Sequence, residues 1–215
     1  MQHWGLTDPG CVRSQNQDTF QIEELNKHSL LCVICDGMGG AKSGNVASQL
    51  AADVFTQEVK RSFKSDMDQD ALDRMLQSAV KLANFTVYDQ AQQFEEFSGM
   101  GTTLVAVLVT GKNATFVNVG DSRLYLLDET IHQITRDHSL VEEMVAQGKM
   151  ERGSLEYQAR KNVITRAVGV SESVTADFYE VVLMPGERIL MCSDGLSNMV
   201  TDEEMLTIVR REISL

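Results

Sequence analysis

Proline and long apolar runs are scarce in this chain of 215 residues. Only two prolines occur, Pro9 and Pro185, and the longest aliphatic runs, at 30–35 and 104–109, are far shorter than the ~20 residues of a membrane-spanning helix. The first residues contain neither a basic stretch nor an apolar one, so we expect no signal peptide. These absences predict a soluble cytoplasmic protein without linkers or repeats.

Positive charge is also scarce. The chain has 19 Lys and Arg against 31 Asp and Glu, which gives a formal net charge of −12. A surface of this sign repels nucleic acid and anionic membranes, so we expect neither as a partner. No apolar stripe suggests a partner helix, and we expect a monomer.

Cysteine occurs four times, as Cys11, Cys32, Cys35 and Cys192. Three of these residues lie in or at the end of apolar runs, which is typical of reduced core thiols and not of a disulfide framework. Cys32 and Cys35 have the spacing of a zinc or redox pair, but no further ligands stand at a similar spacing. We therefore expect no cysteine chemistry.

The pattern of apolar residues predicts one α+β domain over residues 1–215. Helical spacing predicts a helix beginning near Ser43, another over 70–94 and a third from about Asp202. Strands are predicted at 17–25, 30–35, 104–110, 114–120, 123–127, 131–135, 178–184 and 188–192. Short connections rich in turn residues predict an antiparallel meander over 104–135 and a hairpin over 178–192. Neither part can bury its apolar face alone, so we expect a layered fold.

Asp36 and Asp194 each follow an apolar strand and precede a glycine, which lets the chain turn away sharply. Asp18 and Asp121 also stand at the ends of predicted elements. If the strands of Asp36 and Asp194 lie side by side, their carboxylates converge, and they repel each other unless a cation lies between them. The pattern predicts a Mg²⁺ or Mn²⁺ site, and the alternative is that Asp-Gly is an ordinary turn.

Several short motifs occur in a fixed order along nearly the whole chain. They are GCVRSQNQD at 10–18, DGMGG at 36–40, GTT at 101–103, NVGDSR at 118–123, RDHS at 136–139, NVITRAVG at 162–169 and SDGL at 193–196. Together they resemble the metal-dependent PP2C-type (PPM) protein Ser/Thr phosphatases, especially their compact bacterial members. The resemblance implies a four-layer α-β-β-α sandwich, with two antiparallel sheets flanked by helical pairs and a metal site at one rim.

The same resemblance implies that two or three Mn²⁺ or Mg²⁺ ions bind at this rim. Asp36 would bridge two ions, the Gly37 carbonyl would bind one of them and Asp194 the other. Asp18, with Gln17, would act through metal-bound waters. A third ion would lie between Asp194 and Asp121.

The activity implied is hydrolysis of phosphoserine and phosphothreonine in proteins by a metal-activated water, without a covalent phosphoenzyme. Arg13, Asp18 and Asp36 would be the catalytic residues, with Arg13 also binding the substrate phosphate. Met38 stands where some relatives have a His, and it cannot donate a proton to the leaving oxygen. A metal-bound water is the expected acid; His138 is the alternative, unless its role is structural.

Two further expectations come from the resemblance. Segment 151–160 corresponds to a flap beside the active site and would gate substrate access, unless it is an ordinary surface loop. The family's last Asp motif and closing strand do not follow, so we expect a C-terminally truncated domain. The alternative function is therefore a weak or inactive PP2C-like regulator that binds phosphoproteins. As an enzyme, it would act on the targets of a cognate Ser/Thr kinase.

Overall fold

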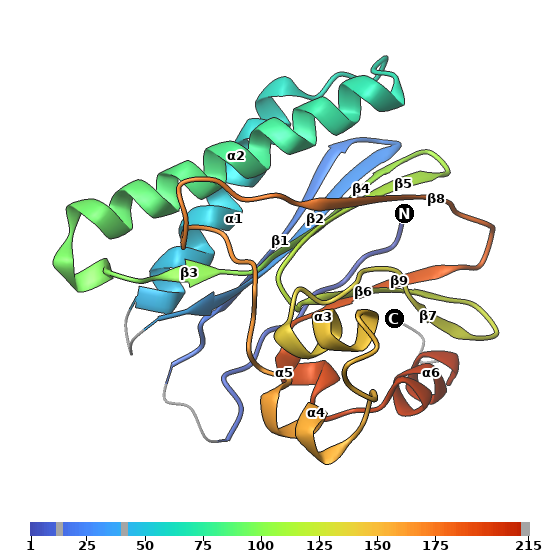
Figure 1. The fold of residues 1–215 in the computed structure, drawn as a ribbon. Helices are drawn as coiled ribbons and strands as arrows, with labels where there is room; N and C mark the ends of the chain where they lie inside the picture. The colour runs from blue at the N-terminus through green and yellow to red at the C-terminus, as the bar shows by residue number, and fades with distance from the viewer. Residues whose placement is uncertain (12–14, 40–42, 212–215) are drawn as a thin grey trace.

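The computed structural model describes residues 1–11, 15–39 and 43–211. Two antiparallel sheets face each other and helices lie on both outer sides, as Figure 1 shows. The larger sheet has the strand order β1-β2-β4-β5-β8, with β3 paired to β2, and the smaller sheet has the order β7-β6-β9. The strands are β1 (Asp18–Asn26), β2 (Ser29–Met38), β3 (Gly101–Thr102), β4 (Leu104–Thr110), β5 (Asn113–Val119), β6 (Arg123–Leu127), β7 (Ile131–Gln133), β8 (Asp177–Val182) and β9 (Arg188–Cys192).

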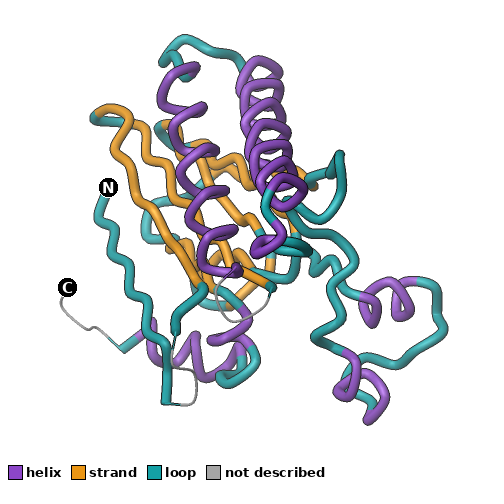
Figure 2. The backbone as a smooth tube through the Cα atoms, turned by 90° about the vertical axis from the view of Figure 1, so that its left-hand side faces the viewer, coloured by secondary structure: helices purple, strands orange, loops and turns teal. Residues whose placement is uncertain are grey.

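Two long helices, α1 (Ser43–Ser62) and α2 (Gln69–Gln93), cover the outer face of the larger sheet (Figures 1 and 2). Their buried residues recur every three or four positions, which gives each helix one apolar face against the sheet. Asp68 caps α2 by accepting a hydrogen bond from the Ala71 N–H at 2.8 Å. Both helices lie within a few residues of the predicted ranges.

The remaining helices are shorter. The first, η1 (Glu95–Phe97), follows α2 directly, and the others come after β7. They are α3 (Leu140–Ala146), α4 (Leu155–Arg160), α5 (Asp194–Ser197) and α6 (Asp202–Arg210). Met205 of α6 packs with Tyr125 and Leu127 of the smaller sheet. In Figure 2, α3 and α4 stand out from the sandwich on one long connection. Segment 151–160, which showed no clear period, thus contains a short helix.

Apolar clusters fill the spaces between successive layers. Leu76 and Phe55 belong to the cluster between the long helices and the larger sheet, and Val107 and Phe116 belong to the cluster between the sheets. Strand β4 is buried on both faces, so it needs a layer on each side. The four-layer α-β-β-α architecture is confirmed.

Two predicted hairpins are wrong, because the short connections are corners between the sheets. Strand β5 pairs with β8, whereas β6 pairs with β7 and β9, so the chain changes sheet at 120–122 and again at 183–187. Gly120 makes the first corner at φ 110°, a backbone conformation that side chains disfavour. Turn residues are common to hairpins and to corners, and they do not tell the two apart.

Three of the four thiols are wholly or partly buried, as expected from the apolar runs around them. Cys35 and Cys192 are buried, Cys32 is half-buried and Cys11 is exposed, and all are free. Burial raises the pKa of Cys32 to about 11, which keeps that thiol protonated and unreactive. In the ranges that the structure describes, no helix has the length and apolarity needed to cross a bilayer.

Candidate metal and active site

Asp18 and Asp36 face each other across neighbouring strands. Asp18 of β1 is the register partner of Asp36 of β2, and opposite residues in an antiparallel pair place their side chains on the same face. Asp18 Oδ2 also accepts a 2.7 Å hydrogen bond from the hydroxyl of Ser193, which is 175 positions away and follows β9. This bond joins the rims of the two sheets. Ser193 was noted only as the first residue of the 193–196 motif, and its contact with Asp18 was not predicted.

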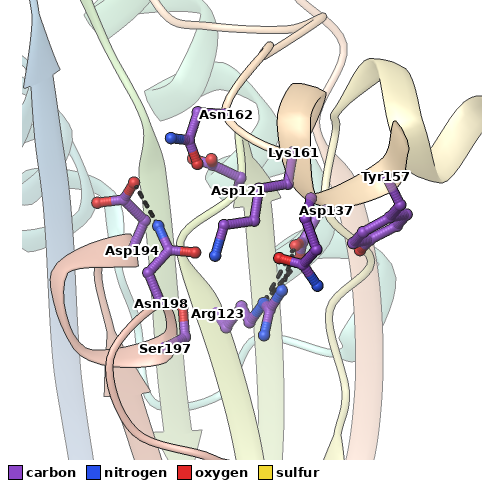
Figure 3. A pocket seen from close by; sticks show the side chains of 10 residues that line it. Asp121, Arg123, Asp137, Tyr157, Lys161, Asn162, Asp194, Ser197 and Asn198 are labelled. Carbon is purple, nitrogen blue, oxygen red and sulfur yellow. Dashed lines mark hydrogen bonds and ion pairs between the residues drawn. The ribbon is translucent and has the colours of Figure 1, made fainter. Parts of the chain in front are cut away.

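Asp194 and Asp121 reach the same place from other elements. Asp194 begins α5 after the smaller sheet ends, and its Oδ2 accepts a 3.0 Å hydrogen bond from Asn198 (Figure 3). Asp121 follows β5 at the corner between the sheets and is 8% exposed. The carboxylates of Asp36 and Asp194 were predicted to converge from strands that lie side by side. The structure shows that these strands are not neighbours. They belong to opposite sheets, and the carboxylates meet across the sandwich.

Burial and mutual repulsion both raise the pKa of two of these carboxylates. Burial, followed by the charges of Asp18 and Asp194, raises the pKa of Asp36 to about 9. Burial, followed by the charges of Asp194 and Asp137, raises the pKa of Asp121 to about 7. A divalent cation would remove the repulsion and favour the ionised forms, so the donor set fits a hard metal ion.

Carboxylates alone do not complete a metal site. Within the described ranges, no three Asp, Glu, His or Cys side chains are close enough together to hold an ion by themselves. Any ion bound here would need carbonyl or water oxygens too, and Mg²⁺ commonly keeps several waters in protein sites.

The carbonyl of Gly37 was predicted to bind one ion, but the reason for a glycine at this position differs from the one predicted. Strand β2 continues through Gly37 to Met38, where it pairs with β3, so the chain does not turn there. A Cβ on Gly37 would lie 1.9 Å from the carbonyl oxygen of Gly44 in α1. Glycine is required because the first turn of α1 approaches the strand so closely.

A cavity of ≈270 Å³ opens over this cluster. Asp36, Asp121 and Asp194 line it. Asn162 and Ile164 close it from the segment after α4, and the sequence had indicated them only as part of the 162–169 motif. Arg13, the predicted phosphate ligand, lies outside the described residues.

Buried hydroxyls hold the backbone of Asp36 in place. Thr103 Oγ1 accepts a 2.9 Å hydrogen bond from the Asp36 N–H, and the Thr103 N–H donates to the Asp36 carbonyl at 2.9 Å. Thr103 Oγ1 also lies 2.7 Å from Ser122 Oγ, next to Asp121. Both hydroxyl residues are fully buried. Thr103 and Ser122 thus connect two carboxylate positions that come from different segments.

We expect Thr103→Val to weaken metal binding while keeping the shape of the side chain. The Asp36 N–H loses its acceptor, which costs about 1–3 kcal/mol of stability. Loss of such an outer contact lowers metal affinity by about tenfold. Thermal unfolding and calorimetric Mn²⁺ titration measure the two effects. Thr86→Val, on α2, removes only a bond to the Leu82 carbonyl and is the control; equal Mn²⁺ affinity in both variants would contradict the expectation.

His138 has a structural environment. Its Nδ1 accepts a 3.1 Å hydrogen bond from the Gly120 N–H, so Nε2 carries the proton and faces Asp177 at 3.1 Å. Only 4% of the residue is exposed, and burial lowers its pKa. Both ring nitrogens are occupied within the fold, so His138 positions the Gly120 corner and is not placed to protonate a leaving group.

Known proteins are similar to this chain in sequence and in fold. Residues 12–213 match the family model of protein phosphatase 2C. The serine/threonine phosphatase stp of Listeria welshimeri is 34% identical over 210 residues, covering 97% of this chain and 83% of that protein. The protein phosphatase PhpP of Streptococcus pneumoniae is 34% identical over 215 residues, covering 98% and 85%.

Solved structures agree with the sequence relatives. The S. agalactiae serine/threonine phosphatase superposes with a TM-score of 0.90 at 32% identity, covering 98% of this chain and 86% of that one. Stp1 from Staphylococcus aureus gives a TM-score of 0.86 at 35% identity, covering 96% and 81%. With the carboxylate rim, the shared sandwich and the match over nearly its whole length, this chain belongs to the protein phosphatase 2C family.

Proposed function

We propose that this chain hydrolyses phosphoserine and phosphothreonine esters in proteins, using divalent metal ions held at the rim of the sandwich. The observation that carries the proposal is the meeting of Asp18, Asp36, Asp121 and Asp194, from both sheets, beside one cavity. A phosphate ester is itself an anion, and it cannot approach these carboxylates unless cations neutralise them. The family and the named activities of the relatives support the same reaction.

Each ligand has a proposed role. Asp36 would lie between two Mn²⁺ or Mg²⁺ ions, with the Gly37 carbonyl on one and Asp194 on the other. Asp121 and Asp194 would share a third ion. Asp18 would act through water, and Ser193, which donates a hydrogen bond to Asp18, would hold its carboxylate in one orientation. The raised pKa of Asp36 supports a site that needs positive charge.

When bound, such ions acidify a water molecule and neutralise charge on the phosphoryl oxygens. The chain's own residues bind and orient the ester. Asn162 and Ile164 line the cavity together with the carboxylates, so they would limit the approach of the substrate. Arg13 would bind the phosphoryl group with its planar guanidinium, which matches two phosphate oxygens at once.

Arg13→Ala should therefore weaken phosphate binding and slow turnover on a phosphopeptide. A charge-assisted pair of hydrogen bonds contributes about 1.5–3 kcal/mol, so we expect kcat/KM to fall about 10- to 100-fold. Steady-state kinetics with a phosphothreonine peptide measures this. Arg61→Ala removes an exposed guanidinium that pairs with Glu58 on α1, and it serves as the control. Wild-type kinetics in the Arg13 variant would eliminate the assigned role.

The cellular setting follows from the same proposal. The substrates would be targets of a Ser/Thr kinase, because a phosphatase of this specificity reverses that modification. The buried, protonated thiols support a reducing compartment, such as the cytoplasm. We further propose that the enzyme acts as a monomer.

A further inference from the structure

A second cavity, of ≈150 Å³, adjoins the carboxylate cavity. The two share Asp121, Asn162 and Asp194 in their linings. The rest of the lining comes from α4 and its C-cap Lys161, from Arg123 of β6, from Asp137 before α3, and from Ser197 and Asn198 at the end of α5 (Figure 3). A side chain entering the second cavity would therefore belong to a residue close to the one whose phosphate occupies the first.

The charges around this second cavity do not cancel once metal is bound. Arg123 is neutralised by Asp137, since its Nη2 lies 2.7 Å from Oδ2 and its Nε donates to Oδ1 at 3.0 Å. Asp121 and Asp194 would be neutralised by the ion that they share. Lys161 is the remaining charge, and it has no ion pair with any residue in the described part of the chain. In Figure 3 its side chain extends into the cavity between Asp194 and Asp137.

Lys161 is presented by a fixed element. It is the C-cap of α4, and Tyr157 of the same helix donates a 2.6 Å hydrogen bond to Glu142 of α3. Glu142 is 5% exposed and also pairs with Arg152, so its charge is compensated. Ser154 caps the start of α4 by accepting from the Tyr157 N–H. These bonds hold α4 against α3 and keep Lys161 at the cavity.

We propose that this cavity is a specificity subsite that binds an Asp or Glu side chain flanking the phosphorylated residue, with Lys161 as its charge partner. The uncharged donors Gln158 and Asn162 provide further hydrogen bonds to a carboxylate. The volume suffices, since a cavity of about 150 Å³ holds a benzene ring in another protein. The inference rests on the proposed function, because the ligand is part of a phosphoprotein substrate.

The test uses phosphothreonine peptides of one length, in which the residues flanking the phosphothreonine are all Glu, all Ala or all Lys. Hydrolysis is measured at saturating Mn²⁺. A partly exposed ion pair with charge-assisted hydrogen bonds should give the wild type a kcat/KM about three- to tenfold higher for the Glu peptide than for the Ala peptide. The Lys peptide should be the poorest substrate.

Variants assign this preference to Lys161. Lys161→Gln should remove the preference for Glu, and Lys161→Glu should reverse it in favour of the Lys peptide. Lys149→Glu makes the same charge change on the exposed turn after α3, and it should keep the wild-type order. Among the described residues, the Lys149 ammonium donates a hydrogen bond only to Gln147. An unchanged order in Lys161→Glu, or the same reversal in Lys149→Glu, overturns the proposal.

Other outcomes separate the subsite from the proposed function. Equal rates on all peptides by the wild type overturn the subsite and leave the phosphatase activity intact. If the wild type hydrolyses neither the peptides nor a small aryl phosphate, the proposed function is refuted, and the subsite is refuted with it. If the Lys161 variants shift only the Mn²⁺ half-saturation, Lys161 acts on the ion and the subsite is refuted.

Discussion

Asp36→Asn should lower kcat/KM by at least about 10³-fold at saturating Mn²⁺, because the variant loses the charge that would hold two ions together. The substitution keeps the size of the side chain, so the loss comes from charge and not from packing. Burial, followed by the charges of Asp18, Asp194 and Asp121, raises the pKa of Asp36. Phosphate release from a phosphothreonine peptide measures the effect.

The matched control for this variant is Asp66→Asn. Asp66 is exposed in the turn between α1 and α2, far along the chain from any proposed ligand, so the same chemical change should leave kcat/KM at the wild-type value. Retention of more than about a tenth of the activity in Asp36→Asn would show that the ions do not depend on this carboxylate.

The same substitution should stabilise the metal-free protein. The pKa of Asp36 is raised from 3.8 to about 9, so the folded protein retains a proton that the unfolded chain releases. The free energy of unfolding therefore falls as pH rises between these values, and most of the loss is present at pH 8. Asp36→Asn has no such loss. We expect its melting temperature at pH 8 to exceed that of the wild type by roughly 5 °C, which corresponds to about 2 kcal/mol.

Thermal unfolding with a chelator present, at pH 5 and at pH 8, tests this expectation. The gap between variant and wild type should be small at pH 5 and wide at pH 8. Adding Mn²⁺ should then stabilise the wild type more than the variant, because only the wild type keeps the full ligand set. A variant that melts at or below the wild-type temperature at pH 8 would contradict the electrostatic account of the site.

Local pattern determined much of this fold. The predicted ranges are close to those of the helices α1 and α2 and of the strands β4, β6 and β9. The spacing of apolar residues in these elements shows whether one face or both faces are buried. The passage of the chain from one sheet to the other was not predicted at Gly120 or near Pro185. The turn residues there predicted hairpins, but they form corners between the sheets. Pairing between strands distant in the sequence decides that question, and a local pattern does not contain it.

The candidate site, too, could be predicted only in part from the sequence. Its carboxylates stand at recurring positions in motifs and could be selected from the sequence. Ser193, Thr103 and Ser122 also stand in these motifs, but their roles could not be predicted, since their hydrogen-bond partners are distant in the chain. The prediction that the carboxylates of Asp36 and Asp194 converge was correct, but the predicted geometry was wrong. The two carboxylates meet across two sheets and not from neighbouring strands.

The most direct test of the central claim is Mn²⁺-dependent phosphate release from a phosphothreonine peptide by the purified chain, with Asp36→Asn and Asp194→Asn measured alongside. We predict release by the wild type with Mn²⁺, its loss on chelation, and its loss in both variants. A wild-type chain that binds the phosphopeptide but releases no phosphate at any Mn²⁺ concentration would contradict the account and would indicate a phosphoprotein-binding regulator.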